Sequence, residues 1–411
     1  MRTGNRSGPA VGKISIALLV GVVVTAMVVL GGGGALGQQV APSPPQAPTP
    51  APPFTAIDLN PSGFDESHGM DISGGEQVGY GAGPATGGHT HALLWRGSAA
   101  SVVDLHPSNS DFGAQSRSAG WDRADSAAVG VCGGQQVGYG GSVIPLLWRG
   151  SAASVVDLSP SKGVQLEGIG EAGIEYSQTL ATSGDQQVGG GRETATSGNS
   201  HHALLWRGTP ADVVELQAPS GIWESYAVGT SAEEQVGYGY WGRASEGVTH
   251  ALLWHGSPAA AVDLHPRGFS SSEADSTSGG QQVGYGSGPA TGGQDHALLW
   301  RDSAESVVDL HPAGFFYSRA LGTNGEEQVG WGDQHALLWQ GTAASVVDLH
   351  TFLPPGFTAS VATDIDATGD IVGTAWGPAS GNRYHAFLWE RNVPKPPASG
   401  RQSTSRCQDQ P

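Results

Sequence analysis

The sequence predicts an all-β fold, a seven-bladed β-propeller built from four-stranded antiparallel blades. Three observations predict it: short motifs recur seven times, their apolar runs are too short for helices, and glycine supplies 65 of the 411 residues. Glycine costs about 1 kcal/mol per helical position relative to alanine, so this composition favours turns and strands. A repeat of about 40 to 50 residues is typical of propellers and solenoids.

The first 37 residues indicate an export segment. Basic residues precede an uncharged apolar run at residues 14–30, and the small residues Ala35 and Gly37 follow it. This order is typical of a cleaved signal peptide, whereas the length of the run also fits the lower limit for an uncleaved membrane anchor. We therefore expect an exported protein that is extracellular, periplasmic or anchored in a membrane and facing outward.

A proline- and alanine-rich linker at residues 38–54 separates this segment from the repeats at 55–390, and a polar tail that we expect to be disordered follows at 391–411. Proline at this density favours an extended spacer. The two cysteines, Cys132 and Cys407, exclude a disulfide framework and a four-cysteine zinc site. The sequence permits a disulfide between them but does not require one.

Each repeat contains the motifs QVGYG, HALLW and VVDL, preceded by a looser segment of the type S-x-A. Each run is bounded by glycine, serine or proline, as short strands are. A unit therefore supplies four strands, which we name a to d in the order S-x-A, QVGYG, HALLW and VVDL. The tryptophans that end the HALLW motif mark the seven units: Trp95, Trp148, Trp206, Trp254, Trp300, Trp339 and Trp389.

Strands c and d are apolar on both faces, so we expect both to be buried between neighbouring blades. The repeats begin with a lone strand d at residues 55–59 and end with strand c at 385–390. If the first strand pairs with the last three, it completes the final blade and closes the ring. An open β-solenoid is the alternative, although a solenoid would need polar capping repeats.

The last unit carries GDIVG at residues 369–373 and HAFLW at 385–389. These motifs, followed in other units by VDL, resemble those of the bacterial HAF-repeat proteins, which are exported proteins named for that tripeptide. The resemblance covers residues 56–390, and most copies here have HALLW instead of HAF. It implies export and a propeller-like repeat fold. It implies no activity, so no functional residue is carried over from the family.

The recurring histidine and acid predict a structural hydrogen-bond network within each blade, because a buried histidine needs a partner for each ring nitrogen. In the first unit we expect it to join Ser67, His91, Trp95 and Asp104. The alternative, a ring of histidine metal ligands, is disfavoured because one equivalent histidine per blade lies too far from the others. We predict no metal and no cofactor.

Asp364, Asp366 and Asp370 resemble the start of a calcium loop. The bidentate glutamate expected at loop position 12 is absent, since that position is Ala375. A turn stabilised by aspartate side chains is the alternative interpretation.

Catalytic signatures are missing: the chain has no G-x-S-x-G, H-E-x-x-H, Walker or C-x-x-C motif. Catalysis by a pair of carboxylates is an alternative that the sequence leaves open. The acids Glu273, Asp275 and Asp364 stand out in strands a, which are otherwise rich in small and neutral residues. The formal net charge of −18 argues against a nucleic-acid partner.

In an up-and-down blade, the b–c and d–a links emerge on one rim, and the a–b and c–d links on the other. The b–c and d–a links vary most in length and composition, and variable loops on a rigid scaffold usually carry binding. Filling of the rim is the alternative role. The residues that we expect to bind a protein or glycan are Trp121, Trp223, Tyr240, Trp241, Arg243, Phe316, Tyr317, Arg383 and Tyr384.

These observations favour an exported, non-enzymatic propeller that acts as a binding or scaffold module at the cell envelope or outside the cell. Two alternatives stay open. One is a secreted carbohydrate-active hydrolase or lyase that uses carboxylates on the propeller. The other is a purely structural repeat protein without a ligand.

Overall fold

The computed structural model describes residues 53–107, 125–141, 144–160, 174–193, 200–242, 248–256, 261–392 and 407. The predicted export segment and nearly all of the linker and tail lie outside these residues. Within the described part of the chain, no helix is long and apolar enough to cross a membrane. The strands run from Phe54 to Arg391, one residue beyond the predicted repeat region at each end.

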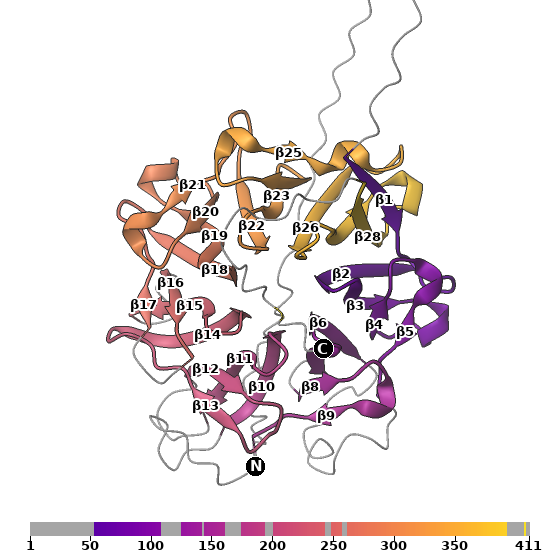
Figure 1. The fold of residues 1–411 in the computed structure, drawn as a ribbon, viewed down its shortest axis with the longest axis horizontal. Helices are drawn as coiled ribbons and strands as arrows, with labels where there is room; N and C mark the ends of the chain where they lie inside the picture. Colours follow the sequence, from indigo (N-terminus) through magenta and orange to yellow (C-terminus); the bar gives the residue numbers. More distant parts are fainter. Residues whose placement is uncertain are drawn as a thin grey trace, which may run out of the picture. The chain divides into compact units, whose positions relative to one another are not determined.

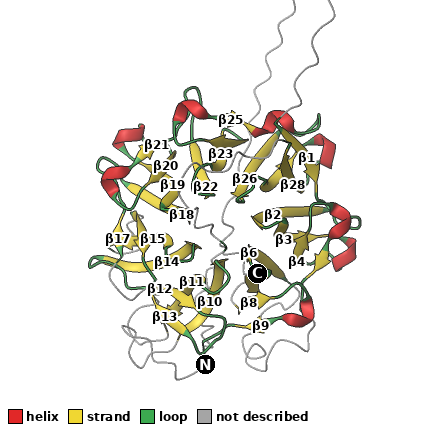
Figure 2. Cartoon of the chain, in the orientation of Figure 1, coloured by secondary structure: helices red, strands yellow, loops and turns green. Residues whose placement is uncertain are grey.

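The structure is a seven-bladed β-propeller, as the repeat predicts, with seven four-stranded antiparallel sheets arranged around a central opening (Figures 1 and 2). Blade 1 contains β2 (Glu66–Ser73), β3 (Glu76–Ala82), β4 (His91–Trp95) and β5 (Val103–Asp104). Blade 2 contains β6 (Ser126–Cys132), β7 (Gln135–Gly140), β8 (Ile144–Trp148) and β9 (Val156–Asp157). Blade 3 contains β10 (Ile174–Thr182), β11 (Gln187–Glu193), β12 (His201–Trp206) and β13 (Val213–Glu215).

The remaining blades repeat this order. Blade 4 contains β14 (Ile222–Thr230), β15 (Gln235–Trp241), β16 (Thr249–Trp254) and β17 (Val262–Asp263). Blade 5 contains β18 (Ser271–Ser278), β19 (Gln281–Ser287), β20 (His296–Trp300) and β21 (Val308–Asp309). Blade 6 contains β22 (Ser318–Thr323), β23 (Gln328–Gly332), β24 (His335–Trp339) and β25 (Val347–Asp348). Blade 7 combines β26 (Ala359–Ile365), β27 (Ile371–Trp376) and β28 (Tyr384–Arg391) with β1 (Phe54–Asp58).

Helical structure in the described residues is limited to short 3-10 turns in the links (Figure 2). They are η1 (Pro84–Thr86), η2 (Ala99–Ser101), η4 (Ala152–Ser154), η6 (Pro289–Thr291), η7 (Ala304–Ser306), η8 (Ala343–Ser345), η9 (Leu349–Phe352) and η10 (Pro378–Ser380). The c–d link contains a 3-10 turn in blades 1, 2, 5 and 6, namely η2, η4, η7 and η8. That turn lets the c–d serine, such as Ser101, accept a hydrogen bond from the amide of Arg96 at 2.7 Å.

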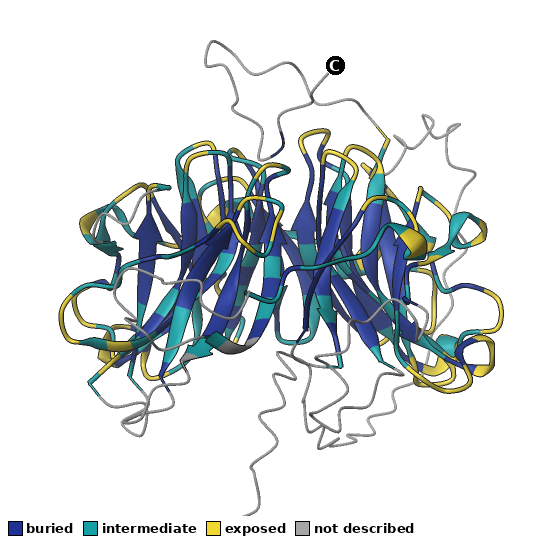
Figure 3. Cartoon of the chain, turned by 90° about the horizontal axis from the view of Figure 1, so that it is seen from below, coloured by how far each residue is buried: buried dark blue, intermediate teal, exposed yellow. Residues whose placement is uncertain are grey.

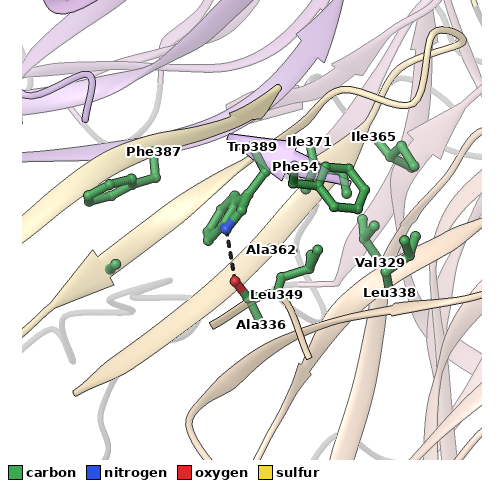
Figure 4. Packing of buried hydrophobic residues seen from close by; sticks show 11 residues of the cluster. Phe54, Val329, Ala336, Leu338, Leu349, Ala362, Ile365, Ile371, Phe387 and Trp389 are labelled. Atoms are coloured by element: carbon green, nitrogen blue, oxygen red, sulfur yellow. Dashed lines mark hydrogen bonds between the residues drawn. The ribbon is translucent and has the colours of Figure 1, made fainter. Parts of the chain in front are cut away.

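The first strand, β1, is the outermost strand of the last blade. It pairs antiparallel with β28 in continuous register, with Ile57 opposite Leu388 and Asp58 opposite Phe387. The Phe54 ring packs in the core between blades 6 and 7, close to Ile365 (Figure 4). The two ends of the repeat region therefore share one sheet, the arrangement that the offset of the motifs predicts.

Buried side chains fill the space between neighbouring blades and produce the dark band through the middle of the ring in Figure 3. Each core cluster joins apolar residues of two consecutive blades; Trp300 of blade 5, for example, lies in one cluster with Leu253 of blade 4. Trp389 also donates its indole hydrogen to the Leu349 carbonyl of the preceding blade at 3.0 Å (Figure 4). Blades thus depend on their neighbours for burial, as repeats do.

Strand d departs from the prediction that it is buried on both faces. Strand c is buried throughout its LLW segment, but β5 consists of only Val103, which is partly buried, and Asp104, which is exposed. Strand d is the outer edge of each blade, so it has a neighbour on only one side. The leucine that follows strand d, such as Leu105 after β5, is the buried apolar residue at this edge of the blade.

A disulfide joins Cys132, at the end of β6, to Cys407 in the tail. Both residues are buried, and the cross-link spans 275 residues of sequence. Such a link stabilises a fold mainly by restricting the unfolded chain.

We expect Cys132→Ser and Cys407→Ser each to lower the free energy of unfolding by about 2–5 kcal/mol. Both variants break the same bond, so their losses and that of the double variant should be equal in urea unfolding experiments. Unfolding curves that coincide with that of the unreduced wild type would contradict this prediction.

Candidate functional site

The recurring histidine and acid form a hydrogen-bonded pair at the outer part of six of the seven blades. His91 Nδ1 lies 2.7 Å from Asp104 Oδ2, as the predicted network requires. Blade 2 has Ile144 in place of the histidine. The equivalent pairs, all between 2.7 and 2.9 Å, are His202–Glu215, His250–Asp263, His296–Asp309, His335–Asp348 and His385–Asp58.

Ser67 and Trp95 do not join this pair, so the predicted four-residue network is wrong in those two members. Ser67 lies on the inner strand β2 and accepts a hydrogen bond from the amide of Ala386 in blade 7 at 3.0 Å. Trp95 Nε1 is buried without a hydrogen-bond partner in the described structure. Strand a is separated from strands c and d by strand b, so its serine reaches the neighbouring blade and not the outer strands of its own.

The serine instead ties consecutive blades together. Ser126 of blade 2 accepts from the amide of Ala92 in blade 1 at 3.0 Å and lies 2.9 Å from His106 Nδ1. The His106 ring stacks on His91, with ring centroids 4.0 Å apart. These contacts give the recurring histidines, serines and acids a structural role at the blade junctions.

The aspartates of the calcium-like segment accept hydrogen bonds from the chain itself, and Asp364 Oδ2 accepts from the amide of Ile72 in blade 1 at 3.4 Å. Asp366 Oδ1 accepts from the amide and hydroxyl of Thr368 and from the amide of Asp370. Asp370 Oδ1 accepts from the amide of Arg391 at 2.8 Å. This is the aspartate-stabilised turn considered as the alternative. The described residues contain no group of three or more potential metal ligands.

The exposed large apolar side chains of the described chain are Trp223, Trp241 and Phe316, with exposed fractions of 56%, 43% and 65%. All three lie at the ends of strands or in links on the rim formed by the b–c and d–a links. Trp223 and Trp241 belong to blade 4, and Phe316 precedes β22 of blade 6. These three predicted residues thus lie on blades 4 and 6 of this rim, and we call its blades 4 to 6 the aromatic sector.

The Trp241 ring and the backbone of Phe316 are held in place by their surroundings. The Trp241 ring stacks on His250, with centroids 4.9 Å apart, and covers Gly221, whose φ of +100° is strained for residues with a side chain. The amide of Phe316 donates to the carboxylate of Asp333 at 2.8 Å. Ordering before binding lowers the entropic cost of recognition.

The other predicted binding residues differ in accessibility. Tyr384 packs on His68 and Trp376, with ring centroids 4.8 and 5.2 Å away. Arg383 is exposed beside it, on blade 7 and outside the aromatic sector. Tyr240 and Tyr317 are partly buried within the sector, whereas Trp121 and Arg243 lie outside the described residues.

The inner strands reveal a second asymmetry in the same sector. Every inner strand has a β-bulge at the same place, and the bulged residue is partly buried. Blade 5 has a carboxylate there, Asp275, whereas the other six blades have uncharged residues. Those six are Met70, Val129, Leu180, Val228, Leu321 and Thr363.

Charged and phenolic side chains surround Asp275. Glu273, two residues earlier on β18, accepts a hydrogen bond from the Tyr285 hydroxyl of β19. The Arg319 guanidinium of β22 lies 3.9 Å from the centroid of the Tyr285 ring and donates to Asp295 Oδ2. We call Glu273, Asp275, Tyr285, Asp295 and Arg319 the channel-wall cluster.

Burial raises the pKa of Glu273 and raises that of Asp275 well above its ordinary value. For Asp275 the nearby Glu273 carboxylate acts in the same direction, whereas Arg319 opposes it. Acids with a raised pKa occur often at functional sites, because catalysis and binding use buried carboxylates even where burial lowers stability. The sequence singled out Glu273 and Asp275 but missed Tyr285, Asp295 and Arg319. Aligning the seven strands a would have found Arg319, which occupies the position of Glu273 in the next blade.

The opposite rim carries a cavity of about 740 Å³ lined by the a–b turns of blades 1 to 4. Glycines, serines and glutamines provide much of the lining, together with Glu76 and Arg96. These two residues already form an ion pair at 2.7 Å. This cavity therefore offers mainly backbone and short polar groups, and it is less distinctive than the aromatic sector.

No family model and no curated protein matches the chain. Among solved structures, a puromycin-hydrolysing peptidase from Mycobacterium tuberculosis matches with a TM-score of 0.49 and 13% identity, over 83% of this chain and 57% of that one. The β-propeller domain of the Trilobed protease from Pyrococcus furiosus matches with a TM-score of 0.44 and 10% identity, over 80% and 94% of the two chains. An oligogalacturonate lyase from Vibrio parahaemolyticus matches with a TM-score of 0.44 and 8% identity, over 82% and 91%. The chain spans less than two thirds of the peptidase, and these likenesses concern the fold alone.

Proposed function

We propose that this protein is an exported, non-enzymatic β-propeller that binds a protein or glycan ligand at the cell envelope or outside the cell. The observation that carries the proposal is the aromatic sector: the three exposed large apolar side chains of the described residues share one rim and span blades 4 to 6. Exposed aromatic side chains on a rigid scaffold are typical anchors of recognition.

Other features support the placement outside the cytoplasm. The disulfide between Cys132 and Cys407 suits an oxidising compartment, where such bonds persist. The order of basic, apolar and small residues within residues 1–37 suits export, with a membrane contact limited to an N-terminal anchor. The HALLW and VDL motifs, which resemble those of exported HAF-repeat proteins, are consistent with this location. The net charge of −18 disfavours nucleic acid as the ligand.

A glycan array and a pull-down from envelope extracts, both with the full chain, test the binding role. We expect Trp223→Ala and Phe316→Ala each to weaken capture of the ligand at least about tenfold, because buried aromatic anchors carry 2 kcal/mol or more. Arg207→Ala is the matched control, since Arg207 is exposed on the opposite rim. Equal capture by all three variants would contradict the assignment of the ligand to the aromatic sector.

A second function, a carbohydrate-active hydrolase or lyase, is favoured by one observation. Glu273 and Asp275 lie two residues apart on β18, and burial raises the pKa of both, as general acid catalysis requires. Turnover of a polysaccharide by the purified chain, abolished by Glu273→Gln, would replace the non-enzymatic proposal with this one. If neither a ligand nor turnover is found, the protein is a structural repeat.

A further inference from the structure

Asp275 is a buried acid in a place where the fold does not need one. The six equivalent bulged residues show that an uncharged side chain suits this position. Asp275 Oδ2 is buried and has no hydrogen-bond partner in the described structure. A buried carboxylate oxygen without a donor costs several kcal/mol, so some other group is needed to satisfy it.

The cation next to Asp275 is already engaged elsewhere. Arg319 donates through Nε to Asp295 Oδ2 at 2.9 Å, and its guanidinium plane covers the Tyr285 ring. The side chains of Arg319 and Asp295 are 24% and 27% exposed, so this pair forms the solvent-facing edge of the channel-wall cluster. Behind it, the carboxylates of Glu273 and Asp275 outnumber the cations that act on them.

Aromatic rings complete the wall on the side of blade 4. Tyr238 of β15 is mostly buried and lies within electrostatic range of Glu273, Asp275 and Glu224, whose carboxylates add to the effect of burial in raising its pKa. The inner strands β14, β18 and β22 follow one another around the central opening in this sector (Figure 1), and β15 lies behind β14 in blade 4, where it also contacts β18. Carboxylates beside tyrosine faces provide what an organic cation needs, because the ring attracts the charge and the carboxylate accepts its hydrogens.

Arg319 is one example within the chain, because its guanidinium contacts both the Tyr285 ring and the Asp295 carboxylate. We propose that Asp275 and Glu273, with the rings of Tyr238 and Tyr285, form a subsite for a second cation, the ammonium or guanidinium group of the ligand. This inference rests on the proposed binding function and names one chemical group of its ligand. The net charge of −18 attracts such a cation toward the protein.

The cation has two sources, a lysine or arginine side chain of a partner protein or a free polyamine. Calorimetric titration of the full chain with n-butylammonium, methylguanidinium and n-butanol tests the shared chemistry, since n-butanol has the same alkyl chain without the charge. The tripeptide acetyl-Gly-Lys-Gly-amide and spermidine then distinguish the two sources, because the source that fits the subsite should bind more tightly.

We expect the two cations to bind and n-butanol not to bind, and Asp275→Asn and Glu273→Gln each to weaken cation binding at least tenfold. Glu233→Gln is the matched control, because it removes the same charge from an exposed acid on the opposite rim. Circular dichroism melts establish that each variant is folded, and two independent variants keep the test decisive if one of them is not.

Absence of cation binding, equal affinity of the wild type and both variants, equal binding of n-butanol, or binding of Ca²⁺ alone would each overturn the inference. The two proposals fail separately. Capture of a macromolecule that depends on Trp223, without any cation binding, would overturn only the cation subsite. Cation binding that depends on Asp275, without any captured macromolecule, would overturn only the proposed function.

Discussion

Removal of residues 1–60 should lower the melting temperature by more than about 10 °C relative to a chain that lacks only residues 1–50. The longer deletion removes β1 and Leu59, and with them the buried side chains of Phe54 and Leu59, each of which contributes about 1.5–3 kcal/mol. It also exposes the edge of β28, because β1 pairs with β28 from Phe387 to Arg391. A loss of about 5 kcal/mol corresponds to a shift of this size in a large domain.

Differential scanning calorimetry of the two chains provides the measurement. A synthetic peptide of residues 53–61 should restore part of the lost stability to the shorter chain, because the gap in blade 7 remains open to a matching strand. Equal melting temperatures for the two chains would show that the pairing of β1 with β28 does not hold the ring together.

Asp275→Val should stabilise the protein by about 1–3 kcal/mol at neutral pH, because it replaces a buried carboxylate oxygen without a donor by a residue that blade 2 carries at the same bulge. The gain should depend on pH. Burial and Glu273 raise the pKa of Asp275 in the folded state, so above pH 4 the unfolded chain releases its proton before the folded chain does. The wild type therefore loses stability as the pH rises, whereas the variant lacks this loss.

Chemical denaturation of both proteins at pH values from 3.5 to about 8 measures the difference. We expect the curves to approach each other below about pH 4 and to separate as the pH rises. The control is Leu321→Val at the equivalent bulge of blade 6, which leaves charge unchanged and should shift stability equally at all pH values. If Asp275→Val destabilises the protein at neutral pH, the carboxylate is a structural element and not a strained functional one.

The fold was predictable because its information is local and repeated. A tryptophan at the end of each HALLW run and an acid within each VVDL run mark successive strands, and the lone strand at Phe54–Asp58 indicates the shared last blade. The distance between Ser67 and His91 was not predictable in this way. Both residues recur once per unit, and recurrence alone does not tell whether two residues meet within a blade or across a junction.

The candidate site was harder to predict, because it depends on residues that depart from the repeat. Asp275 is informative because the six equivalent residues are uncharged. These seven residues can be aligned only through the β-bulge, which is defined by the backbone register of the structure. Tyr285 belongs to a recurring QVGYG motif, so its contact with Glu273 and Arg319 depends on which neighbours its blade has acquired. Side chains contributed by three consecutive blades, as here, are visible only when the blades are assembled.

The sheet that joins Phe54–Asp58 to Tyr384–Arg391 determines when this protein can finish folding during its synthesis. A ribosome makes the first of these segments more than three hundred residues before the second, so the earliest strand must wait, without its hydrogen-bonding partner, until almost the entire polypeptide has been synthesised. Cys132 waits in the same way for Cys407. A prematurely terminated polypeptide therefore lacks both the pairing of β1 with β28 and the disulfide. We expect such incomplete chains to stay partly unfolded and to be degraded by proteases.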